Sequence, residues 1–157
     1  MLSGATLAYR AAKVLRDAPP GFGSQAFGDS TRQPVRIVAH MADLMAWGVT
    51  TAAGGKEWKA DGSDDWAREV DRFFSGLAAL DAAIAADGPF AGSLEKLIQG
   101  PFADALTHVG QLAMLRGMAG APVRPESYAR ATIVAGQVGI EQGPPGFEFD
   151  GDASAKR

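Results

Sequence analysis

Apolar residues recur every three or four positions along four long stretches of the chain. This spacing gathers apolar side chains on one face of an α-helix, the face that packs against a core. The clearest repeat consists of Trp66, Val70, Phe73, Leu77, Leu80 and Ile84. The four stretches are 2–16, 30–53, 63–86 and 101–118. The pattern therefore predicts an all-α fold, and specifically a four-helix bundle.

Capping residues and helix breakers indicate where these helices begin and end. Ser30 or Thr31 is expected to cap the second helix, with Pro34 tolerated in its first turn. The acidic run 63–65 is expected to begin the third helix, and the Asp-Gly-Pro sequence at 87–89 is expected to end it.

A short helical segment is expected over 93–99, before the fourth long helix. The Gly-Pro pair at 100–101 is expected to interrupt the chain there, with the proline at the first position of the next helix. Beyond Pro122 the amphipathic pattern fades. One helical turn is expected within 126–131 and an extended stretch over 133–139.

The last residues of the chain are expected to form a tail. The segment 141–157 contains Gly143-Pro-Pro-Gly followed by small and charged residues, a composition with little tendency to order by itself. Phe147 and Phe149 are candidate anchors for its start. We therefore expect a bundle domain over 1–140 and an extended C-terminal segment over 141–157.

Composition narrows the class of protein. The chain has 157 residues, 46% of them hydrophobic, and a formal net charge of −3, which suits one globular domain. No basic run appears, so a nucleic-acid partner is not expected. Neither a signal-peptide pattern nor a membrane-spanning stretch of roughly 20 apolar residues is present, so a cytoplasmic location without membrane contact is expected. The absence of cysteine excludes disulfides, thiolate zinc sites and a cysteine nucleophile.

The candidate chemistry lies on the fourth helix. At about 100° per residue, Asp104, His108, Gln111 and Leu115 fall on one stripe, and Leu112 beside it indicates that the stripe faces the core. Its three polar side chains would then point inward, where unpaired polar groups are destabilising. A partner that satisfies them is therefore expected.

A divalent metal ion is the partner that we favour. Asp104 and His108 are four residues apart, so they lie one turn above the other and suit two ligands of one ion. His40 lies on the apolar stripe of the second helix with Ile37 and Leu44, where it can supply a third ligand. Two imidazoles and one carboxylate suit zinc or nickel, and also iron or manganese, and leave coordination positions open.

Two of these stretches resemble motifs of the DinB/YfiT-like superfamily of four-helix metalloenzymes. Residues 36–44 (RIVAHMADL) are similar to the helix that carries the family's second-helix histidine, and 104–112 (DALTHVGQL) to the family's HxxxH-x-x-Q helix. The segments 120–123 (GAPV) and 136–139 (GQVG) resemble the end of such domains. The resemblance covers about residues 2–139 and implies a bundle of the up-down-down-up type.

The resemblance also implies a ligand set and a function. The family usually offers three histidines to the metal; His40 and His108 align with two of them, and Asp104 stands in the place of the third. Family members include metal-dependent transferases that activate a low-molecular-weight thiol, such as bacillithiol or mycothiol, and thiol-dependent isomerases. The resemblance thus implies an enzyme that activates a thiol or water for transfer to a small-molecule substrate.

The candidate ligands also have a purely structural interpretation. Asp104 and His108 could form a buried ion pair that fixes helix packing, with His40 bonded to Asp43 or to a backbone carbonyl. Asp43 is either a partner that orients the ring of His40 or, as we favour, a solvated carboxylate. The alternative function is therefore a non-catalytic helical module that binds a small ligand or a protein partner. A ferritin-like di-iron site is excluded because paired Glu-x-x-His motifs are absent.

Gln111 and Trp47 are the remaining candidates for the site. Gln111 bonds either a metal-bound water or a polar network in the core. Trp47 either forms the wall of a substrate pocket or packs in the core, as an aromatic residue at this spacing usually does. A homodimer is expected from the small residues of the first helix and the aromatic loop that contains Phe22 and Phe27.

Overall fold

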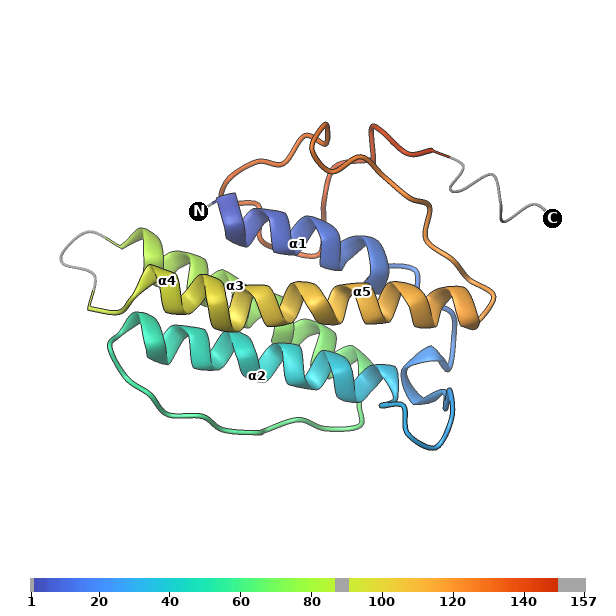
Figure 1. Ribbon diagram of the computed structural model, residues 1–157, viewed down its shortest axis with the longest axis horizontal. Helices are drawn as coiled ribbons and strands as arrows, with labels where there is room; N and C mark the ends of the chain where they lie inside the picture. The colour runs from blue at the N-terminus through green and yellow to red at the C-terminus, as the bar shows by residue number, and fades with distance from the viewer. Residues whose placement is uncertain (1, 87–90, 150–157) are drawn as a thin grey trace.

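In the computed structural model, which describes residues 2–86 and 91–149, the chain folds as a bundle of four long helices (Figure 1). These are α1 (Leu2–Leu15), α2 (Pro34–Ala52), α3 (Trp66–Ala85) and α5 (Ala103–Met118). The shorter elements are a 3-10 turn, η1 (Phe22–Ser24), a single helical turn, α4 (Leu94–Leu97), and a π-helical turn, η2 (Ile98–Phe102). The described residues contain no β-strand, so the prediction of an all-α bundle is confirmed.

The four long helices run up, down, down and up, as Figure 1 shows. α2 and α3 point in the same direction because the connection between them, residues 53–65, returns along the length of α2. α1 and α5 run in the opposite direction. The topology agrees with the one that the family resemblance implies, and α2 contacts both α3 and α5.

The core forms where the apolar faces of the long helices meet. In the repeat that predicted α3, Phe73, Leu77 and Leu80 have no exposed surface. The other three members, Trp66, Val70 and Ile84, are partly buried against the core. Ala8 and Ala11 of α1 are also fully buried, because small side chains let neighbouring helices approach closely. These small residues therefore pack within the chain, and homodimerisation stays a prediction.

The start of α2 differs from the expected one. The cap predicted at Ser30 or Thr31 is wrong, because α2 begins at Pro34 and the preceding Gln33 is extended, with φ −60° and ψ 146°. The ring of a proline clashes with a helical conformation of the residue before it. The helix therefore cannot begin earlier than Pro34, which occupies its first turn as expected.

The start of α3 agrees with the sequence. Asp65 caps the helix, and its side chain accepts a hydrogen bond from the backbone N–H of Arg68 at 3.1 Å. The helix ends at Ala85. The stop predicted at 87–89 lies outside the described residues.

The break expected at 100–101 does not occur. The chain continues from α4 through η2 into α5 as one helical run, with Pro101 inside it. Proline lacks the N–H that a regular helix uses, and its ring clashes with the carbonyl four residues earlier. The wider π turn accommodates both features. The predicted position of Pro101 at the first residue of a new helix is therefore wrong.

The segment after α5 returns along α1 without forming a further helix (Figure 1). Residues 126–131 form hydrogen-bonded turns in place of the expected helical turn. A turn closed by a hydrogen bond from Gln137 N–H to Val134 O interrupts the stretch that was expected to be extended. Glu126 forms an isolated antiparallel bridge with Glu148.

The two phenylalanines proposed as anchors of the tail lie next to this bridge. The carbonyl of Phe147 accepts a hydrogen bond from Ser127 N–H at 3.1 Å, and Phe149 N–H donates to Pro125 O at 3.0 Å. Backbone hydrogen bonds therefore hold the described part of the tail against the preceding segment. Residues 150–157 lie outside the described part of the chain.

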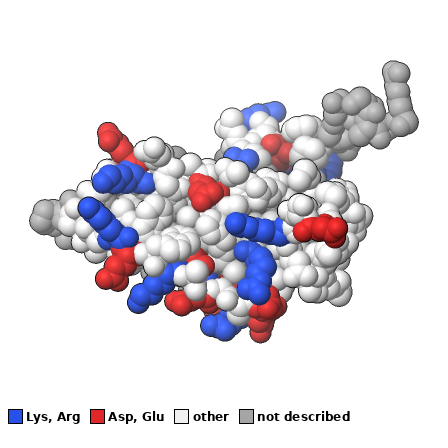
Figure 2. Space-filling view, turned by 60° about the horizontal axis from the view of Figure 1, so that its bottom comes forward, with Lys and Arg blue, Asp and Glu red and all other residues white. Residues whose placement is uncertain are grey.

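Charged side chains of both signs are interspersed on the face shown in Figure 2. No helix in the described part of the chain has the length and apolar character needed to cross a bilayer.

Candidate metal centre

Two helices bring the three candidate ligands together. α2 carries His40, and α5 carries Asp104 and His108. Nε2 of His40 lies 3.3 Å from Oδ2 of Asp104, and Nε2 of His108 lies 3.2 Å from Oδ1 of the same carboxylate. The two imidazole rings meet at 87°, with their centroids 4.9 Å apart. The carboxylate of Asp104 therefore lies within reach of both rings.

The spacing of these atoms fits ligands of one cation. One ligand atom from each residue lies within 4.8 Å of the other two. Ligands about 2.0–2.1 Å from a tetrahedral zinc ion are about 3.3–3.4 Å apart. The two carboxylate–imidazole distances are close to this value, and each involves a different oxygen of Asp104. Charge-assisted hydrogen bonds are shorter, about 2.7–2.9 Å. The three residues can therefore hold a metal ion, with positions left open for water or substrate.

Gln111 orients the ring of His108. Its Oε1 lies 2.7 Å from Nδ1 of His108, and because an amide oxygen only accepts hydrogen bonds, this contact favours the form of the ring that carries a hydrogen on Nδ1. In the neutral tautomer of that form, an unprotonated Nε2 faces Asp104 and is able to bind a metal. Gln111 is exposed at the surface, so the expectation that it points into the core is wrong.

The site lies at the edge of the bundle, where a small molecule can reach it. His108 is the most enclosed ligand, with 10% of its side chain exposed, whereas His40 has 27% and Asp104 has 44%. A cavity of about 560 Å³ opens onto them. The inward placement expected for the whole stripe therefore holds for His108 and not for Asp104. The cavity is lined by Ser30, Thr31, Arg32, Ile37, His40, Asp104, His108, Gln111, Met114 and Leu115.

Asp43 does not belong to this site. It is buried, pairs with Arg72 of α3 and accepts a hydrogen bond from the backbone N–H of Asp61 at 3.2 Å. Burial raises the pKa of its carboxyl, although the Asp61 N–H and the Arg72 guanidinium favour the ionised form. Both interpretations from the sequence, a partner of His40 and a solvated carboxylate, are therefore wrong.

Trp47 lies farther along α2 and does not line the cavity beside His40. The residue that sequence reasoning missed is Trp58, whose ring centroid lies 5.7 Å from that of His40 and 6.0 Å from that of Trp47. Trp58 belongs to the connection between α2 and α3. The only signal in the sequence was a large aromatic residue within an otherwise polar segment.

Comparisons with known protein families, with curated proteins and with solved structures found no match. The function must therefore be inferred from the arrangement of the site itself. That arrangement offers two imidazoles, one carboxylate and an adjoining cavity.

Proposed function

We propose that this protein is a metal-dependent enzyme of the DinB-like type, which activates a low-molecular-weight thiol or water for transfer to a small molecule. The observation that carries the proposal is the convergence of His40, Asp104 and His108, whose ligand atoms lie within 4.8 Å of one another. The up-down-down-up bundle, which agrees with the family resemblance of the sequence, supports it further.

Each residue of this site has a different proposed role. His40 and His108 offer neutral nitrogen ligands, and Asp104 contributes negative charge between them. A divalent ion bound here supplies Lewis acidity, which lowers the pKa of a coordinated thiol or water toward neutrality. Gln111 keeps the His108 ring in the tautomer that binds metal. Zinc or nickel suits this donor set best, and iron or manganese also accepts it.

The cavity beside the ligands supports a small-molecule substrate. Its volume of about 560 Å³ lies within the range of pockets that bind small ligands, about 300–1,000 Å³. Met114 and Leu115 give it an apolar side, and Arg32 and Gln111 add polar groups at its rim. A substrate with a short apolar portion and a polar reacting end fits this lining.

Metal analysis of the protein purified without a histidine tag tests the proposal. We expect about one divalent ion per chain in the wild type and almost none in His108→Ala, because two ligands hold an ion far less tightly than three. Thr107→Ala is the matched control, since Thr107 is exposed on the preceding position of α5. Equal metal content in His108→Ala and the wild type would contradict the proposal.

A thiol-consumption assay with the metal-loaded protein then tests catalysis separately. Turnover that disappears in His108→Ala and persists in Thr107→Ala would support the enzymatic part of the proposal. A protein that binds the ion but shows no turnover with a range of thiols and electrophilic acceptors would favour the non-catalytic module.

A further inference from the structure

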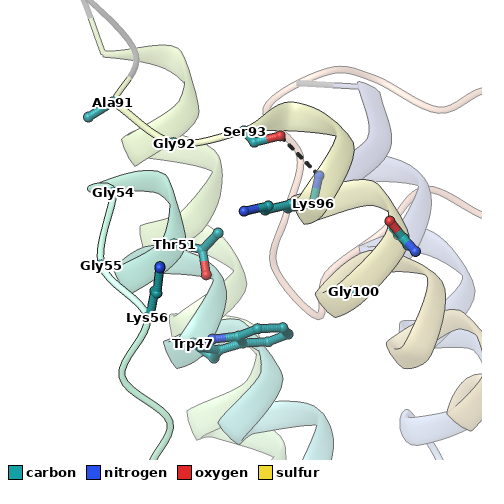
Figure 3. A pocket seen from close by; sticks show the side chains of 11 residues that line it. Trp47, Thr51, Gly54, Gly55, Lys56, Ala91, Gly92, Ser93, Lys96 and Gly100 are labelled. Carbon is teal, nitrogen blue, oxygen red and sulfur yellow. Dashed lines mark hydrogen bonds between the residues drawn. The ribbon is translucent and has the colours of Figure 1, made fainter.

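A second cavity, of about 720 Å³, lies between the C-terminal end of α2 and the α4–η2 segment (Figure 3). It shares no lining residue with the cavity beside His40. Trp47 on its wall lies seven residues beyond His40, about 10 Å farther along α2 at 1.5 Å per residue. The lining residues are Trp47, Thr51, Gly54, Gly55, Lys56, Ala91, Gly92, Ser93, Lys96, Gln99 and Gly100.

Close backbone packing shapes this cavity. A Cβ atom on Gly92 would lie 2.3 Å from the carbonyl oxygen of Thr51, so only glycine lets the segment before α4 approach the end of α2 so closely. A Cβ atom on Gly100 would lie 3.0 Å from the indole ring of Trp47. The lack of a side chain at Gly100 therefore makes room for that ring as a wall of the cavity.

The charge on the cavity is positive. Lys56 and Lys96 are the charged residues among the described residues that line it, and neither forms an ion pair within the described part of the chain. They come from different elements, the connection after α2 and the α4 turn, and both side chains extend toward the space beside Thr51 (Figure 3). Two ammonium groups that face one cavity favour an anionic ligand.

Thr51 adds a polar group without a partner. It is 8% exposed, and its buried Oγ1 has no hydrogen-bond partner. The neighbouring Thr50 donates to the carbonyl of Ala46 four residues earlier, at 3.3 Å, which is the usual bond of a threonine within a helix. A buried hydroxyl without a partner destabilises the fold. Thr51 lines the cavity although its Oγ1 is covered, so rotation of the side chain would let the hydroxyl bond a ligand there.

We propose that this cavity binds a small organic anion. Its carboxylate or phosphate group lies between Lys56 and Lys96, close to Thr51. Its apolar portion lies against the indole of Trp47. The proposal is independent of the metal centre, because the two cavities have separate linings.

Calorimetric titration of the full-length protein with phenyl phosphate, benzoate and the neutral analogue benzyl alcohol tests this proposal. We expect the two anions to bind and benzyl alcohol to bind at least about tenfold more weakly, since charge-assisted hydrogen bonds are the strongest available here. The ratio of the dissociation constants of phenyl phosphate and benzoate identifies the preferred anionic group. The same titrations in His108→Ala should be unchanged, which separates this site from any anion bound to a metal.

Substitution of the lysines tests where the anion binds. Lys96→Gln and Lys56→Gln should each weaken binding of the preferred anion about tenfold. Lys59→Gln is the matched control, because it removes the same charge from the same connection at a residue outside this cavity. Equal weakening in all three variants would show only a general attraction of anions and would overturn the proposal, as would the absence of binding by both anions.

Thr51→Val separates a ligand-binding role from a structural one. Removal of an unpartnered buried hydroxyl should raise the melting temperature, whatever the hydroxyl does. If the hydroxyl serves the ligand, the same substitution should also weaken anion binding several-fold. A stabilised variant with unchanged affinity would remove Thr51 from the site.

Discussion

Two polar clusters in this molecule both place carboxylates beside nitrogen groups, but they differ in where the positive charge comes from. The lysine cluster consists of Tyr9, Lys13, Glu126 and Glu148, and the histidine cluster of His40, Asp104 and His108. Nζ of Lys13 lies 2.7 Å from each of its two carboxylates. The carboxylate of Asp104 instead lies 3.2 and 3.3 Å from two imidazole nitrogens, which need not be charged. The lysine cluster thus contains its own cation, whereas the histidine cluster could hold a metal ion from outside.

The pKa shifts in the lysine cluster show that its hydrogen bonds stabilise the charges it contains. Burial alone would raise the pKa of Glu126, but hydrogen bonds from Lys13 and Tyr9 outweigh it and hold the pKa below its ordinary value. Burial would lower the pKa of Lys13, but its bonds to Glu126 and Glu148 raise it. Burial and the bond to Glu126 together raise the pKa of Tyr9. The pKa shifts of Glu126, Lys13 and Tyr9 therefore favour an ionised carboxylate, a charged ammonium and a neutral phenol.

Removal of the internal cation should have the largest effect. Lys13→Met removes the ammonium that lies 2.7 Å from the enclosed carboxylate of Glu126, while Arg124 keeps its ion pair with Glu148 at 3.3 Å. We expect a loss of about 3–5 kcal/mol in the free energy of unfolding. Urea denaturation measures it. Lys59→Met, at an exposed position, should stay within about 0.5 kcal/mol of the wild type. Similar losses in the two variants would show that the lysine cluster contributes little to stability.

Addition of a divalent cation is expected to have the next largest effect, and only at the histidine cluster. Zn²⁺ at about 100 times its dissociation constant should add about 2.7 kcal/mol to the free energy of unfolding, because it binds the folded state. A chelator should reverse the gain. His108→Ala should show no gain, and an equal gain in that variant would place the ion elsewhere.

Substitution of the residue that orients His108 should affect metal binding without affecting the fold. Gln111→Leu should weaken metal affinity about 10–100-fold and change the free energy of unfolding by less than about 0.5 kcal/mol, because Gln111 is exposed. Gln111→Glu keeps an acceptor for Nδ1 and should retain affinity. Equal affinities in the leucine and glutamate variants would contradict the role given to Gln111.

The smallest expected effect comes from Tyr9→Phe, and it depends on pH. At about pH 7 the loss of the bond to Glu126, 2.6 Å long, should cost about 1.5 kcal/mol. Groups whose pKa is raised on folding stabilise the protein below their unfolded pKa and lose that contribution as the pH rises. Wild-type stability should therefore fall above the ordinary pKa values of Tyr9 and Lys13, 10.0 and 10.5.

Urea denaturation at about pH 7 and about pH 11 measures this difference. The decline should be shallower in Tyr9→Phe, where only Lys13 contributes to it. At acid pH the lowered pKa of Glu126 predicts the opposite trend, a stability lost as the pH falls below its ordinary value of 4.5. Identical alkaline declines in both proteins would show that Tyr9 does not titrate with unfolding.

Much of the candidate metal site could be predicted because its geometry is local. Asp104 and His108 are four residues apart, so helix periodicity alone places their side chains together. His40 required one further step, the inference that its stripe faces the same side of the bundle. Gln111 was found in the same way, although its exposure depends on where the helix meets solvent.

Other contacts in the molecule join residues that are distant in the sequence, and helix periodicity does not predict them. Asp43 is buried in an ion pair with Arg72, which lies on another helix. The ring of Trp58 reaches His40 from a connection without secondary structure. The partners of Lys13 lie 113 and 135 residues later in the chain. Such pairings form only after loops have closed, and a pattern of neighbouring residues does not encode them.

The sequence by itself determined the four long helices, their buried faces and the pair of candidate ligands on α5, because helix periodicity is a property of short stretches. Only the tertiary structure decided which polar cluster contains its own cation and which one is open to an ion from outside. The physical reason is that charge balance at a buried carboxylate depends on every group that packs around it, and those groups come from distant parts of the chain.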